Sequence, residues 1–273
     1  MPKPPFRFIE EDSQGSSPKL KVRDARGSIW SVKWGPEVNS DVFASRLAWA
    51  SGYVVQPMHF VARGKILGAK GLKRADKHVA PDGTFVNARF QLRDPSMKFL
   101  DRDWSWNDNP FEGTREWNGL RIVMMLTSNW DNKDARDASR GSNTGILQYA
   151  SGGRTHWAFF VADWGGSMGK WGGLWEREKW DCEGYAEQTP DFIKGVDDGI
   201  VEWGFHGQHT SSQKKDIAVA DVKWLLRYAG RITDSQLRAG LRASGATAAE
   251  TACFTKAIRS RINQMRAVAS RNR

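Results

Sequence analysis

The stretch His156-Trp-Ala-Phe-Phe-Val-Ala-Asp163-Trp-Gly-Gly-Ser-Met-Gly169 decides which fold we expect for this chain. Its first seven residues are mostly bulky and apolar, which is typical of a strand covered on both faces. Three glycines among the next seven residues then end the strand. The stretch therefore predicts a buried strand that holds Asp163 at its end.

The residues before this stretch predict the other half of a hairpin and a buried helix. Gly145-Ile-Leu-Gln-Tyr149 reads as a strand, and Gly152-Gly153 provides the turn between the two strands. Further upstream, Thr114 is a helix cap for Arg115–Ser128, whose residues are mostly apolar. A polar loop, 129–145, joins this helix to the hairpin.

The N-terminal part predicts strands around one helix. Ser28–Trp34 alternates apolar and polar residues as a strand does. Asn39 or Ser40 then caps a helix that Gly52 ends. Further strands are expected at Tyr53–Ala62 and Phe85–Leu92.

The C-terminal third predicts helices. Thr233 with Gln236, and Thr247 with Glu250, match the capping-box pattern at the start of a helix. Residues 223–273 carry eleven lysines and arginines against two acids, a net charge of +9, whereas the rest of the chain is nearly neutral. We expect either a solvated basic face or a surface for an acidic partner, nucleic acid or anionic lipid.

Composition excludes several classes of protein. A chain of 273 residues with 40% hydrophobic and 26% charged residues is neither disordered nor collagen-like. Two cysteines are too few for a disulfide scaffold and are interpreted as ordinary buried thiols, which indicate no redox compartment. No segment has the apolar length of a membrane span or the pattern of a signal peptide, so we expect a cytoplasmic protein. The fourteen tryptophans fall mostly in apolar segments and are expected in the core rather than stacked on nucleotides.

Three domains of the chain are expected. Residues 1–20 contain four prolines with serine, glycine and charge, and predict a mobile arm or an extended strap. A turn-rich segment near residue 105 then separates an N-terminal part, 21–105, from a C-terminal part, 106–273.

The first candidate functional residues are a lysine and two acids in the N-terminal part. Lys33 lies on an early strand, and Glu37 and Asp41 open the next helix, where an acid can orient the lysine toward nucleotide phosphates. Taken alone, a lysine on a strand is more often a solvated edge residue.

Two further sets of acids follow downstream. Asp131 and Asp134 lie in the loop between the buried helix and the hairpin, and Asp163 ends the hairpin, where a magnesium ligand would stand. Taken alone, each of these acids is also typical of a turn or loop. The order Lys33, Asp131, Asp163 is nevertheless the order that kinase chemistry requires: a phosphate-binding lysine, a catalytic aspartate and a metal-holding aspartate after a hairpin.

These same stretches resemble a known group of proteins. Trp30-Ser-Val-Lys-Trp-Gly-Pro-Glu37, Asn109-Pro-Phe-Glu-Gly-Thr114, Asn129-Trp-Asp-Asn-Lys-Asp134 and Val161-Ala-Asp-Trp-Gly165 are similar to a family of uncharacterised bacterial proteins, over about residues 28–268. That family is in turn remotely similar to atypical kinase-like proteins, which include HipA-type toxin kinases, phosphatidylinositol kinases and the Golgi casein kinase.

The resemblance implies an α+β, two-lobed kinase-like fold. The N-terminal lobe would be a small antiparallel sheet with one helix, and the C-terminal lobe would be mainly helical. ATP and Mg²⁺ are the implied cofactors, and the phosphate acceptor is unknown. The implied roles are Lys33 on the nucleotide phosphates, Glu37 or Asp41 as its partner, Asp131 as catalytic acid and base, and Asp163 on magnesium.

Some positions depart from the kinase pattern. The second metal-binding asparagine is expected five residues after Asp131, where Arg136 stands, so Asn132 or Asp134 is the substitute metal ligand. The glycine-rich loop is reduced to Arg26-Gly27-Ser28, with Gly27 as a nucleotide-binding residue. Two alternatives therefore remain beside a phosphotransferase: a pseudokinase that binds nucleotide or a partner, and a binder of nucleic acid or anionic surfaces through the basic C-terminal region.

Overall fold

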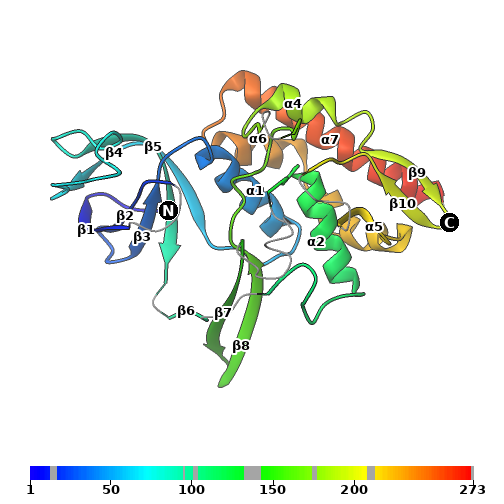
Figure 1. Ribbon diagram of the computed structural model, residues 1–273, viewed down its shortest axis with the longest axis horizontal. Coiled ribbons are helices and arrows are strands. Elements are labelled where there is room, and N and C mark those ends of the chain that lie inside the picture. The colour runs from blue at the N-terminus through cyan, green and yellow to red at the C-terminus, as the bar shows by residue number, and fades with distance from the viewer. Residues whose placement is uncertain are drawn as a thin grey trace.

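A computed structural model of the chain describes residues 1–12, 17–94, 96–100, 104–131, 143–173, 177–207 and 213–271. The architecture is mixed α+β, as predicted: a small barrel and a hairpin of strands stand beside a group of helices (Figure 1).

The N-terminal strands form a closed barrel with the order β1-β2-β3-β5-β4. Its strands are β1 (Phe6–Asp12), β2 (Lys19–Arg23), β3 (Ile29–Lys33), β4 (Met58–Leu67) and β5 (Thr84–Arg93). Neighbours are antiparallel except β1 and β4, which close the barrel through the parallel pairs Phe6↔Ile66 and Arg7↔Leu67. The expected antiparallel sheet is therefore a barrel, and its interior is apolar because alternate residues of each strand point inward.

The arm expected at residues 1–20 is in part a strand. Residues 6–12 form β1, and Phe6 lies in the barrel core, where it is 2% exposed. The prolines that suggested an arm stand outside the strands, at positions 2, 4, 5 and 18. The strand β1 agrees with the extended strap among the two expectations, and Phe6 provides an apolar anchor that composition alone does not reveal.

Helix α1 (Val38–Ala50) connects the barrel to the rest of the molecule. It begins one residue before the expected caps, after Glu37, whose side chain does not cap it. Phe43, Ala44, Leu47 and Ala48 pack in the larger core formed with the C-terminal helices rather than in the barrel core. The helix contacts β4, β5 and α6 (Asp234–Arg242), so it has neighbours on both sides.

The predicted hairpin and its preceding helix are confirmed. Strands β7 (Thr144–Ser151) and β8 (Arg154–Val161) pair through Gly152-Gly153, and the short strand β6 (Lys98–Phe99) adds to β7. The hairpin projects away from the helices (Figure 1). Helix α2 (Arg115–Leu126) is capped by Thr114, whose hydroxyl accepts a hydrogen bond from the Trp117 amide.

The C-terminal third is mainly helical, and most of its other elements pack against the long helix α7 (Ala248–Arg271). Both predicted capping boxes form their hydrogen bonds, at Thr233 with Gln236 and at Thr247 with Glu250. The remaining elements are α4 (Cys182–Glu187), β9 (Ile193–Asp197), β10 (Ile200–Trp203), α5 (Val219–Leu226), the 3₁₀ turn η2 (Ala229–Arg231), and α7 (Ala248–Arg271). Their apolar faces form the larger core with α2.

The two cysteines are not ordinary buried thiols. Cys182 and Cys253 form a disulfide that joins α4 to α7. Sequence spacing does not reveal this pair because the two residues are 71 positions apart. Disulfides are rare in cytoplasmic proteins, so the pair counts against the expected cytoplasmic location, which stays a prediction.

Two further expectations concern the molecule as a whole. Within the described residues, no helix combines the length and the apolar content that a membrane span requires. Among the tryptophans that the structure describes, eight are buried, as expected for core residues. The division of the chain near residue 105 stays a prediction.

Candidate functional site

Lys33 lies at the last position of β3, on the outer face of the barrel. It pairs with Lys19 of β2 on one side and Arg89 of β5 on the other. Its neighbour Val32 points into the barrel core, so alternation along the strand turns Lys33 outward, toward α1. Lys33 is nevertheless only 5% exposed. It is therefore a buried residue and not a solvated lysine at the edge of a sheet.

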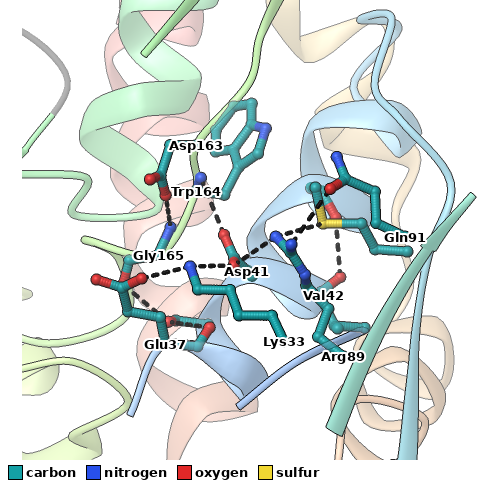
Figure 2. A network of polar contacts seen from close by, with 12 residues as sticks. Lys33, Glu37, Asp41, Val42, Arg89, Gln91, Asp163, Trp164 and Gly165 are labelled. Carbon is teal, nitrogen blue, oxygen red and sulfur yellow. Dashed lines mark hydrogen bonds and ion pairs between the residues drawn. The ribbon is translucent and has the colours of Figure 1, made fainter. Parts of the chain in front are cut away.

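The two acids expected to hold Lys33 both do so. Its Nζ lies 2.5 Å from Oε2 of Glu37 and 3.2 Å from Oδ2 of Asp41 (Figure 2). The carboxylates are four residues apart, so they lie on the same side of α1. Burial lowers the pKa of Lys33, but the negative charges of Asp41 and Asp163 outweigh it and raise that pKa. The lysine is therefore held as a cation.

Asp41 is the centre of the network. Beside Lys33, its carboxylate receives Arg89 Nη1 at 2.8 Å and the amide of Trp164 at 3.1 Å (Figure 2). Asp41 is fully buried and Arg89 is 5% exposed, so these contacts are shielded from water. One carboxylate thus joins the barrel, α1 and the segment after β8.

Arg89 was missed by the sequence analysis. Its signal was available, since a charged residue stands between the apolar residues Ala88 and Phe90 of an expected strand. A charge in such a position needs a buried partner, but the sequence alone cannot say which one.

Asp163 stands just beyond the end of β8 and faces the same network. Its Oδ1 accepts the Gly165 amide at 2.8 Å, which turns the chain after the strand. Gly165 lies so close to Glu37 that a Cβ there would be 2.8 Å from the Glu37 side chain. Burial and the negative charge of Asp41 raise the pKa of Asp163, although Lys33 opposes the shift.

Three carboxylates meet at this point. Ligand oxygens of Glu37, Asp41 and Asp163 lie within 4.8 Å of one another. Hard divalent cations such as Mg²⁺ prefer oxygen ligands of this kind. The structure thus brings three of the predicted acids together around Lys33, two from α1 and one from the hairpin.

Asp131 lies beside this cluster but is not one of the three carboxylates. A Cβ at Gly166 would be 2.6 Å from the Cβ of Asp131, and the Trp130 amide donates to the Gly166 carbonyl at 2.9 Å. The end of the loop from α2 therefore packs on the glycines that follow Asp163. Asn132, Asp134 and Arg136 fall outside the described residues.

Lys179 is a second residue that the sequence analysis missed. Its Nζ is 2.5 Å from Oε1 of Glu37, so Glu37 lies between two lysines. Burial raises the pKa of Glu37, but Lys33 and Lys179 overcome this effect and lower the pKa to about 2. Lys179 lies in a highly charged segment, 176–183, and nothing in its spacing distinguished it.

Gly27 lies at the other end of β3 from Lys33, and its role in nucleotide binding stays a prediction. It lies in the turn between β2 and β3, where Ile29 pairs with Arg23, at the opposite end of β3 from Lys33. Asp12, the last residue of β1, and Lys19, the first residue of β2, lie at the Lys33 end instead, because Asp12 pairs with Lys19, and Lys19 pairs with Lys33. The whole length of β3 separates the β2–β3 turn from Lys33.

Comparisons with known proteins agree with a kinase-like fold. Neither a protein-family model nor a curated protein sequence matches the chain. Among solved structures, the chain is similar to the Helicobacter pylori proinflammatory kinase CtkA, with a TM-score of 0.52, 10% sequence identity and 93% of each chain covered. At this identity the likeness concerns the fold, so the chain has the fold of a kinase-like protein.

Proposed function

We propose that the chain is an ATP- and Mg²⁺-dependent phosphotransferase of the atypical kinase-like type. The observation that carries the proposal is the buried Lys33, held by Glu37 and Asp41 within reach of the charge of Asp163. In this proposal α1 and the barrel strands β3, β4 and β5 belong to a nucleotide-binding lobe, 21–105, and residues 106–273 form a mainly helical catalytic lobe. The similarity of fold to a kinase supports this arrangement.

The residues present fit a nucleotide with a divalent cation. An ammonium group has three N–H donors, and the contacts to Glu37 and Asp41 use two of them, which leaves one for a phosphate oxygen. The oxygens of Glu37, Asp41 and Asp163 provide the hard ligands that Mg²⁺ requires. We expect Asp163 to be the main metal ligand, with Asn132 or Asp134 as the second.

Each residue then has a distinct task in phosphoryl transfer. Bound Mg²⁺ would neutralise negative charge on the phosphates. Lys33 offsets the negative charge that develops on the transferred group. Asp41, which also pairs with Arg89, holds Lys33 in place. Asp131 accepts or orients the proton of the acceptor hydroxyl, since it lies beside the segment that carries Asp163.

A nucleotide-binding pseudokinase is the second candidate. It is favoured by Arg136, which stands where the resemblance places a metal-binding asparagine. In such a protein the guanidinium replaces one magnesium ion, and nucleotide binds without transfer.

The test measures binding and transfer separately. ATP binding is measured by isothermal titration calorimetry, with and without millimolar Mg²⁺, and transfer is measured with γ-labelled ATP to the chain itself and to hydroxyl-bearing peptides. We expect Lys33→Met to weaken ATP binding at least ~tenfold, because it removes a cation from the phosphates. Asp163→Ala is expected to abolish transfer.

Matched controls use the exposed pair Lys65 and Asp82, which are 53% and 59% exposed at their side chains. Lys65→Met and Asp82→Ala should leave binding and transfer unchanged. Transfer that survives Asp163→Ala would reject the phosphotransferase. Binding that ignores Mg²⁺, with no transfer by the unmodified chain, would favour the pseudokinase.

A further inference from the structure

A large hollow lies on the side of α1 that faces away from Lys33. Its volume is about 1170 Å³, and it is bounded by α1, β4, the segment around η2, and α6. We call it the α1–α6 groove. At 100° per residue, its α1 residues Phe43, Arg46 and Ala50 lie opposite Glu37 and Asp41. One helix thus borders both the groove and the candidate active site, and Met58 and Gln56 of the groove lining contact Arg89 and Gln91 beside Asp41.

The groove has an apolar floor and an aromatic rim. The floor is formed by buried or half-buried residues of both halves of the chain: Phe43, Leu47, Val55, Ile232 and Leu237. Trp49 and Tyr228 stand at the rim, where they are 69% and 43% exposed. Large exposed aromatic side chains beside an apolar floor are typical of a surface that binds another molecule.

The charge of the groove is one-sided. Arg46, Arg227, Arg231 and Arg242 line it, and no aspartate, glutamate or lysine is among its described lining residues. Within the part of the chain that the structure describes, none of these arginines forms an ion pair with an acid. Other arginines of the same region are paired, such as Arg259, whose Nε lies 2.7 Å from Oδ1 of Asp234.

His59 also lines the groove, and its pKa is lowered first by burial and then by nearby positive charge. Burial, the positive charge of the chain's N-terminus and that of Arg46 lower the pKa of this groove residue to about 4. A negatively charged group entering the groove therefore meets attraction from several sides.

The lining favours a protein segment over other anionic ligands. Arginine, tryptophan and tyrosine are enriched at protein interfaces, whereas lysine, aspartate and glutamate are depleted there. The groove is larger than the roughly 300–1000 Å³ of a small-molecule site, and its concave shape suits a helix or an extended peptide better than a flat bilayer. An apolar floor without lysine is also unlike a track for a nucleic-acid backbone.

We propose that the α1–α6 groove docks a segment of a partner protein that combines bulky apolar residues with acidic ones. The apolar side chains of the segment fill the floor between Leu47 and Leu237. Its carboxylates pair with Arg231 and Arg242, for which bidentate contacts are the natural geometry. The acidic partner expected from the basic C-terminal region would thus bind at a defined place.

The test begins with a phage library of random 16-residue peptides, selected against the full chain. We expect enriched peptides that carry both acidic and bulky apolar residues. A labelled synthetic copy of the best peptide is then titrated with the protein and followed by fluorescence anisotropy. Replacing Arg231 and Arg242 by Glu should weaken its binding at least tenfold, and Trp49→Ala should weaken it several-fold.

Arg238→Glu is the matched control, because Arg238 is exposed on the same helix, α6, but does not line the groove. It should leave the affinity unchanged, and raised salt should weaken binding to the unmodified chain. The proposal is overturned if no peptide is enriched above an insert-free library, or if the double variant binds the peptides as well as the unmodified chain does. It is also overturned if vesicles containing phosphatidylglycerol, rather than peptides, are bound through Arg231 and Arg242.

Discussion

The positively charged residues on the two sides of α1 differ in burial and in pairing. On the side toward the barrel, Lys33 and Arg89 are buried and paired with acids. On the side toward α6, Arg231 and Arg242 are exposed and have no acidic partner among the described residues. A buried charge without a partner destabilises the fold, whereas an exposed charge is solvated by water and stays available to bind a ligand. We therefore expect substitutions on the first side to change stability and those on the second side to change binding.

Asp41→Asn should have the largest effect on stability. It weakens the contacts of Asp41 with Lys33 and Arg89 and leaves buried positive charge without compensation, which costs about 3–5 kcal/mol. Urea denaturation followed by tryptophan fluorescence measures the loss. The control Asp82→Asn breaks the exposed pair with Lys65 and should cost at most about 1 kcal/mol. Equal losses at the two sites would contradict the buried network.

Glu37→Gln should have the next largest effect, and this effect depends on pH. The pKa of Glu37 is about 2 in the fold and 4.5 in its ordinary state, so the carboxylate stabilises the fold by about 3 kcal/mol at neutral pH. A lowered pKa contributes stability above about 4.5 that is lost as the pH falls through the folded value.

The measurement is the free energy of unfolding of both proteins from pH 7 to pH 3. The difference between them should shrink as the pH falls below about 4.5. Glu10→Gln is the control, since Glu10 pairs with Lys21 but its side chain is 55% exposed. A difference for Glu37→Gln that stays constant with pH would show that its charge does not matter.

Asp163→Asn should have a smaller effect of opposite sign. Burial and Asp41 raise the pKa of Asp163, so its ionised form is disfavoured in the fold at neutral pH. Removing the charge should stabilise the protein by about 1 kcal/mol. The unmodified protein regains this stability as the pH falls toward the raised pKa, so the advantage of the variant should shrink on acidification.

Thermal unfolding of both proteins at pH 7 and pH 5 measures this effect, with the exposed Asp191→Asn as a control near zero. A variant less stable than the unmodified chain at pH 7 would mean that Asp163 stabilises the fold as an anion. Because the proposed function requires Asp163, loss of phosphate transfer should accompany the gain in stability.

Replacing Arg231 and Arg242 by Glu should have the smallest effect on stability. Both side chains are exposed, and neither has an acid to lose, so we expect a change within about 0.5 kcal/mol. Urea denaturation under the same conditions as for Asp41→Asn gives the direct contrast. A loss of several kcal/mol would show that these arginines belong to the fold rather than to a docking surface.

Local patterns predicted much of the secondary structure. Thr114, Thr233 and Thr247 mark the starts of helices because their hydroxyls satisfy backbone amides within the next three residues. The hairpin of β7 and β8 followed from Gly152-Gly153 and from an apolar run. The barrel was not predicted, because its closure depends on two parallel pairs between β1 and β4, more than fifty residues apart.

The candidate site was predictable in part. The order of Lys33, Glu37, Asp41 and Asp163 along the chain pointed to residues that do lie together. Arg89 and Lys179 were missed because each reaches the site from an element that carries no motif. Gly27 was expected from a glycine-rich loop motif, and the pattern alone could not show that its turn lies at the end of β3 opposite to Lys33.

By itself, the sequence determined where several helices begin, where the β7–β8 hairpin turns, and which acids and lysine are of the kind that bind phosphate and metal. These properties depend on residues a few positions apart, which interact whatever the rest of the chain does. Only the tertiary structure decided that Asp41 is shared by Lys33, Arg89 and Trp164, that Cys182 meets Cys253, and that four arginines border one groove. Such contacts join distant residues, and they form only when apolar burial brings the elements that carry them together.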